Sequence, residues 1–431
     1  MKKIKVLFDA EIILDIIYAS KTGAGIYYAT DAIYKELLNN NAVDITLYSS
    51  KRHFGKLQFA LDKNLINPKC KIIKMSKVGA MIAGLEYFRF KSASRYGKFF
   101  FARVVRFIIK VCLQKPLQIF ETKLQLYKKE ADDFDIYYSP IYKVPEHLEK
   151  HKVKRHVFLY DAIPLAMPDK YKGILNENGW YRQLLKQINH SDYYFTDSIS
   201  AKEDFLKYTP TIDEKKITPV LLAADKKFYP CNKKDREVRD KYNIPQGKKY
   251  YLSLCTIEPR KNIFFGVKNF IEFIRRHAID DLIFVVAGGK WKEFSDSILS
   301  QISEIKGSDK FIIPTGYIDN CDLAVLYSNA ECFVYPSLYE GFGLPPLEAM
   351  QCGTPVITSN VSSLPEVVGD AGLMVDPKDD EAMIHAYERI YFDKTLRDEL
   401  SAKGQERAKQ FSWKKSSDQI VDTFIKSLKE E

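Results

Sequence analysis

Short apolar runs and amphipathic stretches alternate along most of this chain. The runs at residues 4–10, 134–139 and 282–287 have the length and the β-branched or aromatic content of buried strands. Residues 26–38 and 263–277 instead repeat apolar positions at the spacing of one helical face. Strands that alternate with helices in both halves of the chain predict parallel βαβ units. The fold class expected from this pattern is α/β.

Further expectations concern the segment after the first strand and the C-terminal part of the chain. After the first strand, the sequence predicts only a long connection that leads to a loop with Gly23 and Gly25. This loop lies too far from the strand, and lacks the third glycine, for a dinucleotide-binding fingerprint. Residues 381–410 are predicted to be largely helical, and 411–428 to form a terminal amphipathic helix.

Length and composition narrow the class of protein. A chain of 431 residues is too long for one hydrophobic core, so two domains are expected. The seven cysteines are odd in number and contain no C-x-x-C, which argues against a disulfide framework or a zinc site and favours a reducing cytoplasm. Asp9, Glu11 and Asp15 interrupt any signal-peptide core, and no apolar run is long enough to span a membrane.

A net charge of +10 suits an anionic ligand or an acidic membrane surface. No nucleic-acid-binding motif is visible, so we expect no nucleic-acid partner. The segment 89–110 carries basic residues but no acidic one, and Arg103, Arg106 and Lys110 share one helical face opposite apolar residues. Such a segment is typical of a helix that lies on an anionic membrane. The alternative is that its apolar face packs on its own domain and its charges are solvated.

Residues 331–377 carry the most specific pattern. A buried strand is followed by Glu340, the tight loop GFGL, two prolines that suit a first helical turn, and Glu348. Across a strand–loop–helix joint, both carboxylates can point into one cleft, at the edge of the sheet where open α/β sheets bind ligands. The plainer interpretation is that Glu348 complements the helix dipole and Glu340 is solvated.

A second joint, in the sequence IEPRKN, places Arg260 and Lys261 between an apolar strand and an amphipathic helix. Arg offers a planar fork of donors, Lys a point charge, and the helix start adds N–H groups, a set that suits a diphosphate. Two solvated cations are the alternative.

These strings, with the following CGTPVITSNVSSLPEVVGDAG, resemble the donor-site signature of the family 4 glycosyltransferases. The resemblance implies the GT-B fold, with two facing Rossmann-like doubly wound domains and a cleft between them. It implies an acceptor-binding domain at residues 1–225 and a nucleotide-sugar-binding domain at 226–410. The helix at 411–431 would cross back onto the first domain.

The resemblance also assigns roles to individual residues. Glu348 would hold the ribose of the donor, and Glu340 its sugar. Backbone groups of Tyr317 and Ile318 would bracket the base, and the helix start at Gly343 and Leu344 would face the diphosphate. The glycine loop near residue 23 would face the donor phosphate and sugar, although a plain flexible loop explains the same residues.

One position departs from the family. Where the family has His-Asp after a strand of the first domain, this chain has Tyr160-Asp161, and tyrosine is a poor base near neutral pH. Asp161 could hold a substrate hydroxyl, or it could cap a turn. A second departure is Cys255, where the family usually has glycine. Further along, Ser363 and Glu366 have the spacing of a helix capping box.

The function expected is transfer of a hexose from a nucleotide-diphosphate sugar to a hydroxyl of a growing glycan, with the anomeric configuration retained. Very similar strings in bacterial polysaccharide mannosyltransferases favour mannose on GDP. Arg260, Lys261 and the helix start would stabilise the leaving diphosphate, so neither a metal nor a cofactor is expected. The alternatives are a catalytically silent relative, a UDP- or dTDP-sugar-dependent transferase, and an epimerase on the same fold.

Overall fold

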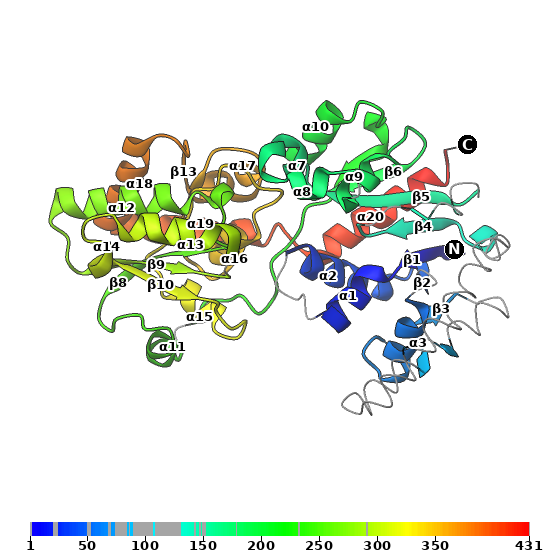
Figure 1. Ribbon diagram of the computed structural model, residues 1–431, viewed down its shortest axis with the longest axis horizontal. Helices are drawn as coiled ribbons and strands as arrows, with labels where there is room; N and C mark the ends of the chain where they lie inside the picture. The colour runs from blue at the N-terminus through cyan, green and yellow to red at the C-terminus, as the bar shows by residue number, and fades with distance from the viewer. Residues whose placement is uncertain are drawn as a thin grey trace. The chain divides into compact units, whose positions relative to one another are not determined.

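The computed structural model describes residues 2–19, 25–49, 53–67, 70–73, 131–141, 152–177, 179–231, 233–289 and 292–430, together with residues 84, 85, 87, 88, 107, 144, 145 and 148. The chain divides into two compact units (Figure 1). The first comprises Met1–Thr196, Asp204–Val220 and Trp413–Glu431, and the second comprises Asp197–Glu203 and Leu221–Ser412.

The first unit is built on a seven-stranded sheet in the order β3-β2-β1-β4-β5-β6-β7. All its described strand pairs are parallel. The order reverses between β1 and β4, as in a doubly wound sheet. The central strands are apolar and buried because helices cover both faces of such a sheet. The strands are β1 (Ile4–Asp9), β2 (Val43–Tyr48), β3 (Lys71–Ile72), β4 (Ile136–Ser139), β5 (Lys154–Tyr160), β6 (Tyr193–Thr196) and β7 (Ile217–Pro219).

Helices of the first unit include the last helix of the chain. Helix α20 buries Ile420, Val421 and Phe424 and contacts α2, so the C-terminal segment packs on the first unit. The helices are α1 (Glu11–Ala19), α2 (Gly25–Asn39), α3 (Phe54–Asp62), α7 (Ile163–Ala166), α8 (Lys172–Leu175), α9 (Trp180–Leu185) and α20 (Trp413–Ser427), while α10 (Ile199–Tyr208) has residues in both units.

The second unit has a six-stranded sheet in the order β10-β9-β8-β11-β12-β13. Its described strand pairs are also parallel, and the order reverses between β8 and β11. The strands are β8 (Lys249–Leu254), β9 (Leu282–Ala287), β10 (Ile312–Gly316), β11 (Cys332–Tyr335), β12 (Val356–Ser359) and β13 (Leu373–Val375). The helices are α11 (Asp235–Lys241), α12 (Ile263–His277), α13 (Lys292–Ser303), α14 (Ser308–Phe311), α15 (Leu323–Ser328), α16 (Leu344–Gln351), α17 (Leu364–Val368), α18 (Asp380–Phe392) and α19 (Lys394–Ala408).

The α/β class with two doubly wound sheets is confirmed, and two details differ from expectation. The predicted connection after the first strand is helix α1, whose Ile12, Ile13 and Leu14 are buried. The stretch 381–410 is largely helical, as predicted, and consists of two helices, because Asp393 is extended and its carboxylate accepts from the N–H of Leu396 at the start of α19. The helices α11 and α13 were not predicted.

Two expectations concern membranes. Apart from an exposed Phe107, the segment 89–110 lies outside the described residues. Among the helices that the structure describes, none has both the length and the apolar character needed to span a bilayer.

Candidate functional site

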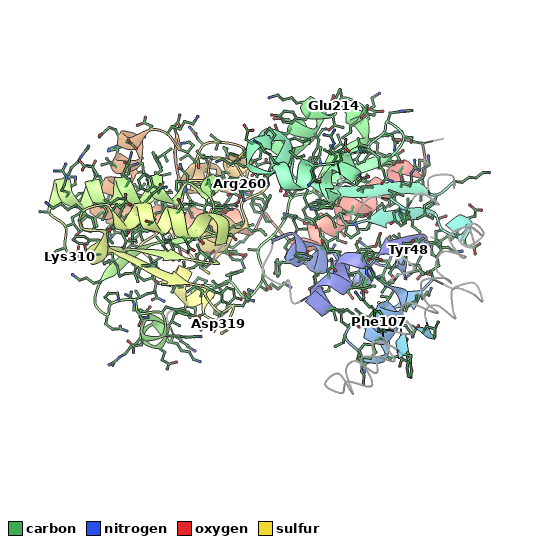
Figure 2. The ribbon with its side chains drawn as sticks, in the orientation of Figure 1. Tyr48, Phe107, Glu214, Arg260, Lys310 and Asp319 are labelled. Carbon is green, nitrogen blue, oxygen red and sulfur yellow. The ribbon has the colours of Figure 1, made fainter. Side chains whose placement is uncertain are left out.

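The first half of the site forms where strand β8 leads into helix α12. Glu258 is extended, and Pro259–Lys261 then makes one turn of 3-10 helix, with proline at the first position, where its missing N–H costs nothing. Asn262 adopts the left-handed conformation (φ 55°), which asparagine tolerates, and α12 begins after it. This turn leaves Arg260 and Lys261 each only 8% exposed. Figure 2 marks Arg260 within the second unit.

The second half is the loop at residues 336–343, between β11 and α16. Strands β8 and β11 are parallel neighbours, so the loops that follow them start at the same edge of the sheet. The N–H of Leu338 donates to the carbonyl of Arg260 at 2.8 Å, which ties the two loops together. Residues about 80 positions apart in sequence therefore meet for a topological reason.

Helix α16 begins at a glycine that the geometry requires. Gly343 has φ 116°, and a Cβ at this position would lie 2.9 Å from Cδ2 of Leu364. Pro345 and Pro346 have no N–H, so Gly343 and Leu344 hold the backbone donors at this helix start. Neither N–H has a hydrogen-bond partner in the part of the chain that the structure describes. Unpaired donors at a helix amino end favour an anion.

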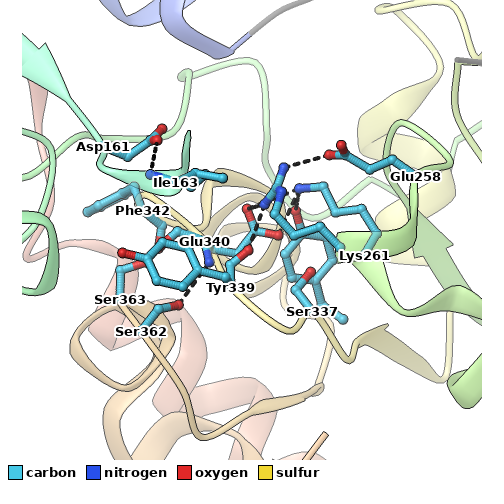
Figure 3. Close-up of polar contacts among 12 residues, drawn as sticks. Asp161, Ile163, Glu258, Lys261, Ser337, Tyr339, Glu340, Phe342, Ser362 and Ser363 are labelled. Carbon is cyan, nitrogen blue, oxygen red and sulfur yellow. Dashed lines mark hydrogen bonds and ion pairs between the residues drawn. The ribbon is translucent and has the colours of Figure 1, made fainter. Parts of the chain in front are cut away.

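Two cations and two carboxylates meet at these loops, in a group that we call the Glu340 cluster: Glu258, Arg260, Lys261, Tyr335 and Glu340 (Figure 3). The Lys261 ammonium donates to Oε1 and Oε2 of Glu340 at 2.8 and 3.0 Å and to the Tyr335 hydroxyl at 2.6 Å. The Arg260 guanidinium lies 2.7 Å from Oε2 of Glu340 and 2.6 Å from Oε1 of Glu258. This geometry agrees with the expectation that Glu340 lies beside Arg260 and Lys261.

The Glu340 cluster is buried and formally neutral. The charged side chains are exposed by 10% or less. Burial by itself would raise the pKa of the Glu340 carboxyl, but attraction by Arg260 and Lys261 and the hydrogen bond from Lys261 lower that pKa to about 2. Glu340 is therefore ionised throughout the physiological range, and the cluster holds two paired charges of each sign.

Glu348 lies on the same helix as the free backbone donors but makes no ion pair with the Glu340 cluster. The hydroxyl of Tyr327, on α15, donates to its Oε2 at 2.9 Å. The bond from Tyr327 is to Oε2, and no hydrogen bond to Oε1 is found among the described residues. Burial raises the pKa of the Glu348 carboxyl to about 7, against the opposing effect of Tyr327. The carboxylate thus has one oriented oxygen and one available oxygen.

Tyr317 and Ile318 follow β10 directly, after Gly316 in the left-handed region (φ 72°). Ile318 is buried, whereas the Tyr317 side chain is 63% exposed. The next turn is held by Lys241, whose ammonium lies 2.7 Å from Oδ2 of Asp319. The two residues predicted to bracket the base therefore lie on an anchored loop at the carboxyl edge of the second sheet.

The remaining predicted residues belong to the first unit. Oδ1 of Asp161 accepts from the N–H of Ile163 at 2.9 Å, which is the turn-capping geometry. Tyr160 is buried with φ 63°, and its hydroxyl lies 2.6 Å from Oγ1 of Thr30. Gly25 is the exposed first residue of α2, and Gly23 lies outside the described residues.

Three residues of this region were missed from the sequence. Glu258 was read only as part of a motif, and Ser362 was not considered. Ser363 was expected to form a capping box with Glu366, which is wrong: it precedes α17, but its hydroxyl bonds to the carbonyls of Glu340 and Phe342. Its place just after β12, the strand beside β11, was the available signal.

Known proteins carry the same pattern. The sequence model of the family described as "Glycosyl transferases group 1" matches residues 234–407. The chain is 31% identical over 313 residues to O-antigen chain mannosyltransferase B of Escherichia coli, a match that covers 72% of this chain and 81% of that protein. The chain belongs to the family 4 (group 1) glycosyltransferases.

Two further comparisons, one with a sequence and one with a solved structure, extend this result. Serotype-specific mannosyltransferase WbdA of Escherichia coli is 31% identical over 276 residues, which cover 62% of this chain but only 33% of WbdA. The crystal structure of HepE from Anabaena in complex with UDP-glucose aligns with a TM-score of 0.62 and 14% identity, over 98% of this chain and 99% of that one. This likeness shows that the GT-B fold, expected from the sequence, is the fold of this glycosyltransferase.

Proposed function

We propose that this glycosyltransferase moves mannose from GDP-mannose to a hydroxyl of a growing glycan, with retention of the anomeric configuration. The observation that carries the proposal is the Glu340 cluster beside the unpaired N–H groups of Gly343 and Leu344. Both features suit the diphosphate and sugar of a nucleotide-sugar donor. The choice of mannose is supported by similarity to the O-antigen chain mannosyltransferase.

The proposed reaction would develop negative charge on the leaving diphosphate and positive charge on the sugar, and the Glu340 cluster has side chains of both signs to stabilise them. The bond between the anomeric carbon and the diphosphate oxygen breaks, and its electron pair leaves with the diphosphate. The acceptor oxygen forms the new bond on the same face of the sugar, and its proton passes to the leaving phosphate. Arg260, Lys261 and the N–H groups at the start of α16 would stabilise the diphosphate as it gains charge. Glu340 would stabilise the positive charge on the sugar.

Glu348 would accept hydrogen bonds from the ribose hydroxyls of the donor. Its Oε2 is oriented by Tyr327, and its Oε1 faces no partner in the described part of the chain. The loop that carries Tyr317 and Ile318 would hold the base. Asp161 would hold a hydroxyl of the acceptor or the donor. The loop with Gly23 and Gly25 would face the donor phosphate and sugar, and the first unit would bind the acceptor.

We propose that the reaction needs neither a metal nor a cofactor, because Arg260 and Lys261 can supply the positive charge that Mg²⁺ supplies in metal-dependent enzymes. We also propose that the protein is cytoplasmic and contacts the membrane through residues 89–110, because this segment has a basic amphipathic sequence.

The test is a transfer assay with the purified full chain. GDP-, UDP-, dTDP- and ADP-sugars are each supplied with a fluorescent mannose-terminated oligosaccharide, with and without EDTA, and the product linkage is determined by NMR. We expect GDP-mannose to give a lengthened product whose new linkage keeps the α configuration of the donor. The rate should be the same with and without EDTA. Product from another donor only would overturn the choice of GDP-mannose, and an inverted linkage would overturn retention. Activity that EDTA abolishes and Mg²⁺ restores would overturn metal independence. Nucleotide binding without transfer from any donor would indicate a catalytically silent relative.

A further inference from the structure

Two consecutive serines hold the loop that carries Glu340. Ser362 and Ser363 lie between strand β12 and helix α17, at the same edge of the sheet as the Glu340 cluster. The N–H of Glu340 donates to Oγ of Ser362 at 2.8 Å. The hydroxyl of Ser363 reaches the carbonyls of Glu340 at 3.0 Å and Phe342 at 2.7 Å (Figure 3). Both backbone groups of Glu340 are therefore bonded to serine hydroxyls.

The side chain of Glu340 is held independently of its backbone. Its carboxylate is fixed by Arg260 and Lys261, which come from a different loop. The serines set the position of the Glu340 backbone, and the cations set the direction of its carboxylate. Since each group has a separate set of partners, the two sets can be perturbed one at a time.

The Ser362 backbone is held in an unfavourable conformation. Its φ is 49°, in the left-handed region, where the Cβ of an L-residue such as serine is strained against the backbone. Ser363 is fully buried, so its hydroxyl must find its partners within the protein. Strain in one serine and complete burial of the next indicate that this short segment is fixed by its contacts with the loop at residues 340–342.

We propose that Ser362 and Ser363 are positioning residues for sugar transfer, which set the place of the Glu340 carboxylate relative to Arg260 and Lys261. This inference rests on the proposed function of the cluster. A bidentate contact between a carboxylate and two cations is lost when the backbone moves by about 1 Å, and catalytic groups placed that loosely lose rate steeply. The serines act through Glu340 and touch no substrate themselves.

The test compares three serine-to-alanine variants of the full chain. Ser362→Ala and Ser363→Ala each remove one set of bonds to the loop and keep the Cβ. Ser401→Ala is the matched control, because Oγ of Ser401, on α19, donates to a backbone carbonyl at the end of α16, that of Gly353, at 2.5 Å. Transfer rates are measured at saturating and at limiting donor, together with the unfolding temperature. Ser363→Thr keeps the hydroxyl and tests rescue.

We expect kcat to fall about 10- to 100-fold in Ser362→Ala and Ser363→Ala, with KM for the donor changed less than threefold. Ser401→Ala should lose similar thermal stability and keep the wild-type kcat. In Ser363→Ala, Glu340 would lose part of its ion pairing while it remains buried, so its pKa should rise and a new acid limb should appear in kcat between about pH 4 and 6. Ser363→Thr should restore most of kcat.

Two results would overturn the inference while the proposed function stands. One is wild-type kcat in both alanine variants. The other is a loss of kcat that Ser401→Ala shares at equal loss of stability. If Ser363→Ala does not fold, Ser362→Ala and Ser363→Thr decide the question. Failure of the unaltered chain to transfer any sugar would instead refute the proposed function, so the two failures are distinguishable.

Discussion

The ion pair between Lys261 and Glu340 allows a test of whether the cluster is a structural unit. The perturbation is a double-mutant cycle of Lys261→Met, Glu340→Gln and the two together, each close in size to the native side chain. Either single change leaves a buried charge without part of its partner. The double change removes one charge of each sign and leaves Arg260 with the carboxylate of Glu258, so the cluster stays neutral.

The expected magnitude follows from the pKa of Glu340. Its pairing lowers the pKa from 4.5 to about 2. At 1.36 kcal/mol per pH unit, the folded state gains about 3 kcal/mol at neutral pH from the ionised form. A carboxyl with a lowered folded pKa contributes stability above pH 4.5 and loses it as the pH falls toward 2. Removal of one partner from a buried pair typically costs about 3–5 kcal/mol, which agrees with this figure.

Calorimetry of the full chain should detect this cost. For a unit of this size, about 3 kcal/mol corresponds to a transition roughly 6–12 °C lower. Hydrogen exchange of peptides from β11 and α16 assigns the transition to the second unit. We expect each single variant to show this fall and to lose transfer activity by at least about 100-fold at a temperature where it is folded. The double variant should be more stable than the sum of the single losses allows.

The reasoning would be refuted if both single variants unfolded within about 2 °C of the wild type and kept its turnover. Strictly additive losses in the double variant would also refute it, because they would mean that Lys261 and Glu340 do not act on each other.

Three further predictions test other parts of the structure. His156 is fully buried, and burial lowers its pKa to about 3. The free energy of unfolding should therefore fall by up to about 5 kcal/mol as the pH drops from 6.5 to 3. In His156→Phe, acid unfolding curves should show a smaller loss of stability over this pH range. Nucleotide affinity, measured by titration calorimetry, should fall as the pH drops below about 7, because Glu348 then becomes protonated. Tyr327→Phe removes the hydrogen bond to Glu348 and should weaken nucleotide binding about fivefold at pH 8. An affinity that does not change with pH would contradict this role of Glu348. Gly288→Ala should prevent or severely weaken folding, because its Cβ would lie 1.9 Å from a facing carbonyl oxygen, whereas Gly289→Ala meets nothing within 4 Å and should leave the unfolding temperature nearly unchanged.

The meeting of Arg260 and Lys261 with Glu340 could be predicted from the sequence for a physical reason. Each motif follows an apolar run of strand length, and a parallel sheet brings the carboxyl ends of its strands to one edge. The order β9-β8-β11 then makes the two loops neighbours. The topology thus converts two local patterns into one contact, and no knowledge of side-chain partners is needed.

The choice of partner within the site could not be predicted in this way. Ser363 and Glu366 have the spacing of a capping box, but the fully buried hydroxyl of Ser363 bonds to carbonyls of a loop that is remote in sequence. Asp161 was left between two roles, and the structure shows the bond to Ile163 that defines a turn. Short polar side chains have several possible partners nearby, and tertiary packing decides among them.

The departure from the family at Cys255 is explained by where the close backbone contact occurs. Cys255 has a negative φ, which any residue adopts, so glycine is not required there for its conformation. The tight approach lies instead at Gly288, whose φ is 127° and whose missing Cβ leaves room for the carbonyl of Cys255. Burial raises the pKa of the Cys255 thiol to about 12, so the side chain stays neutral beside the charges of Lys261 and Glu340. A neutral, small side chain adds no charge to a cluster that is already balanced, which is why cysteine at this position is compatible with the same site.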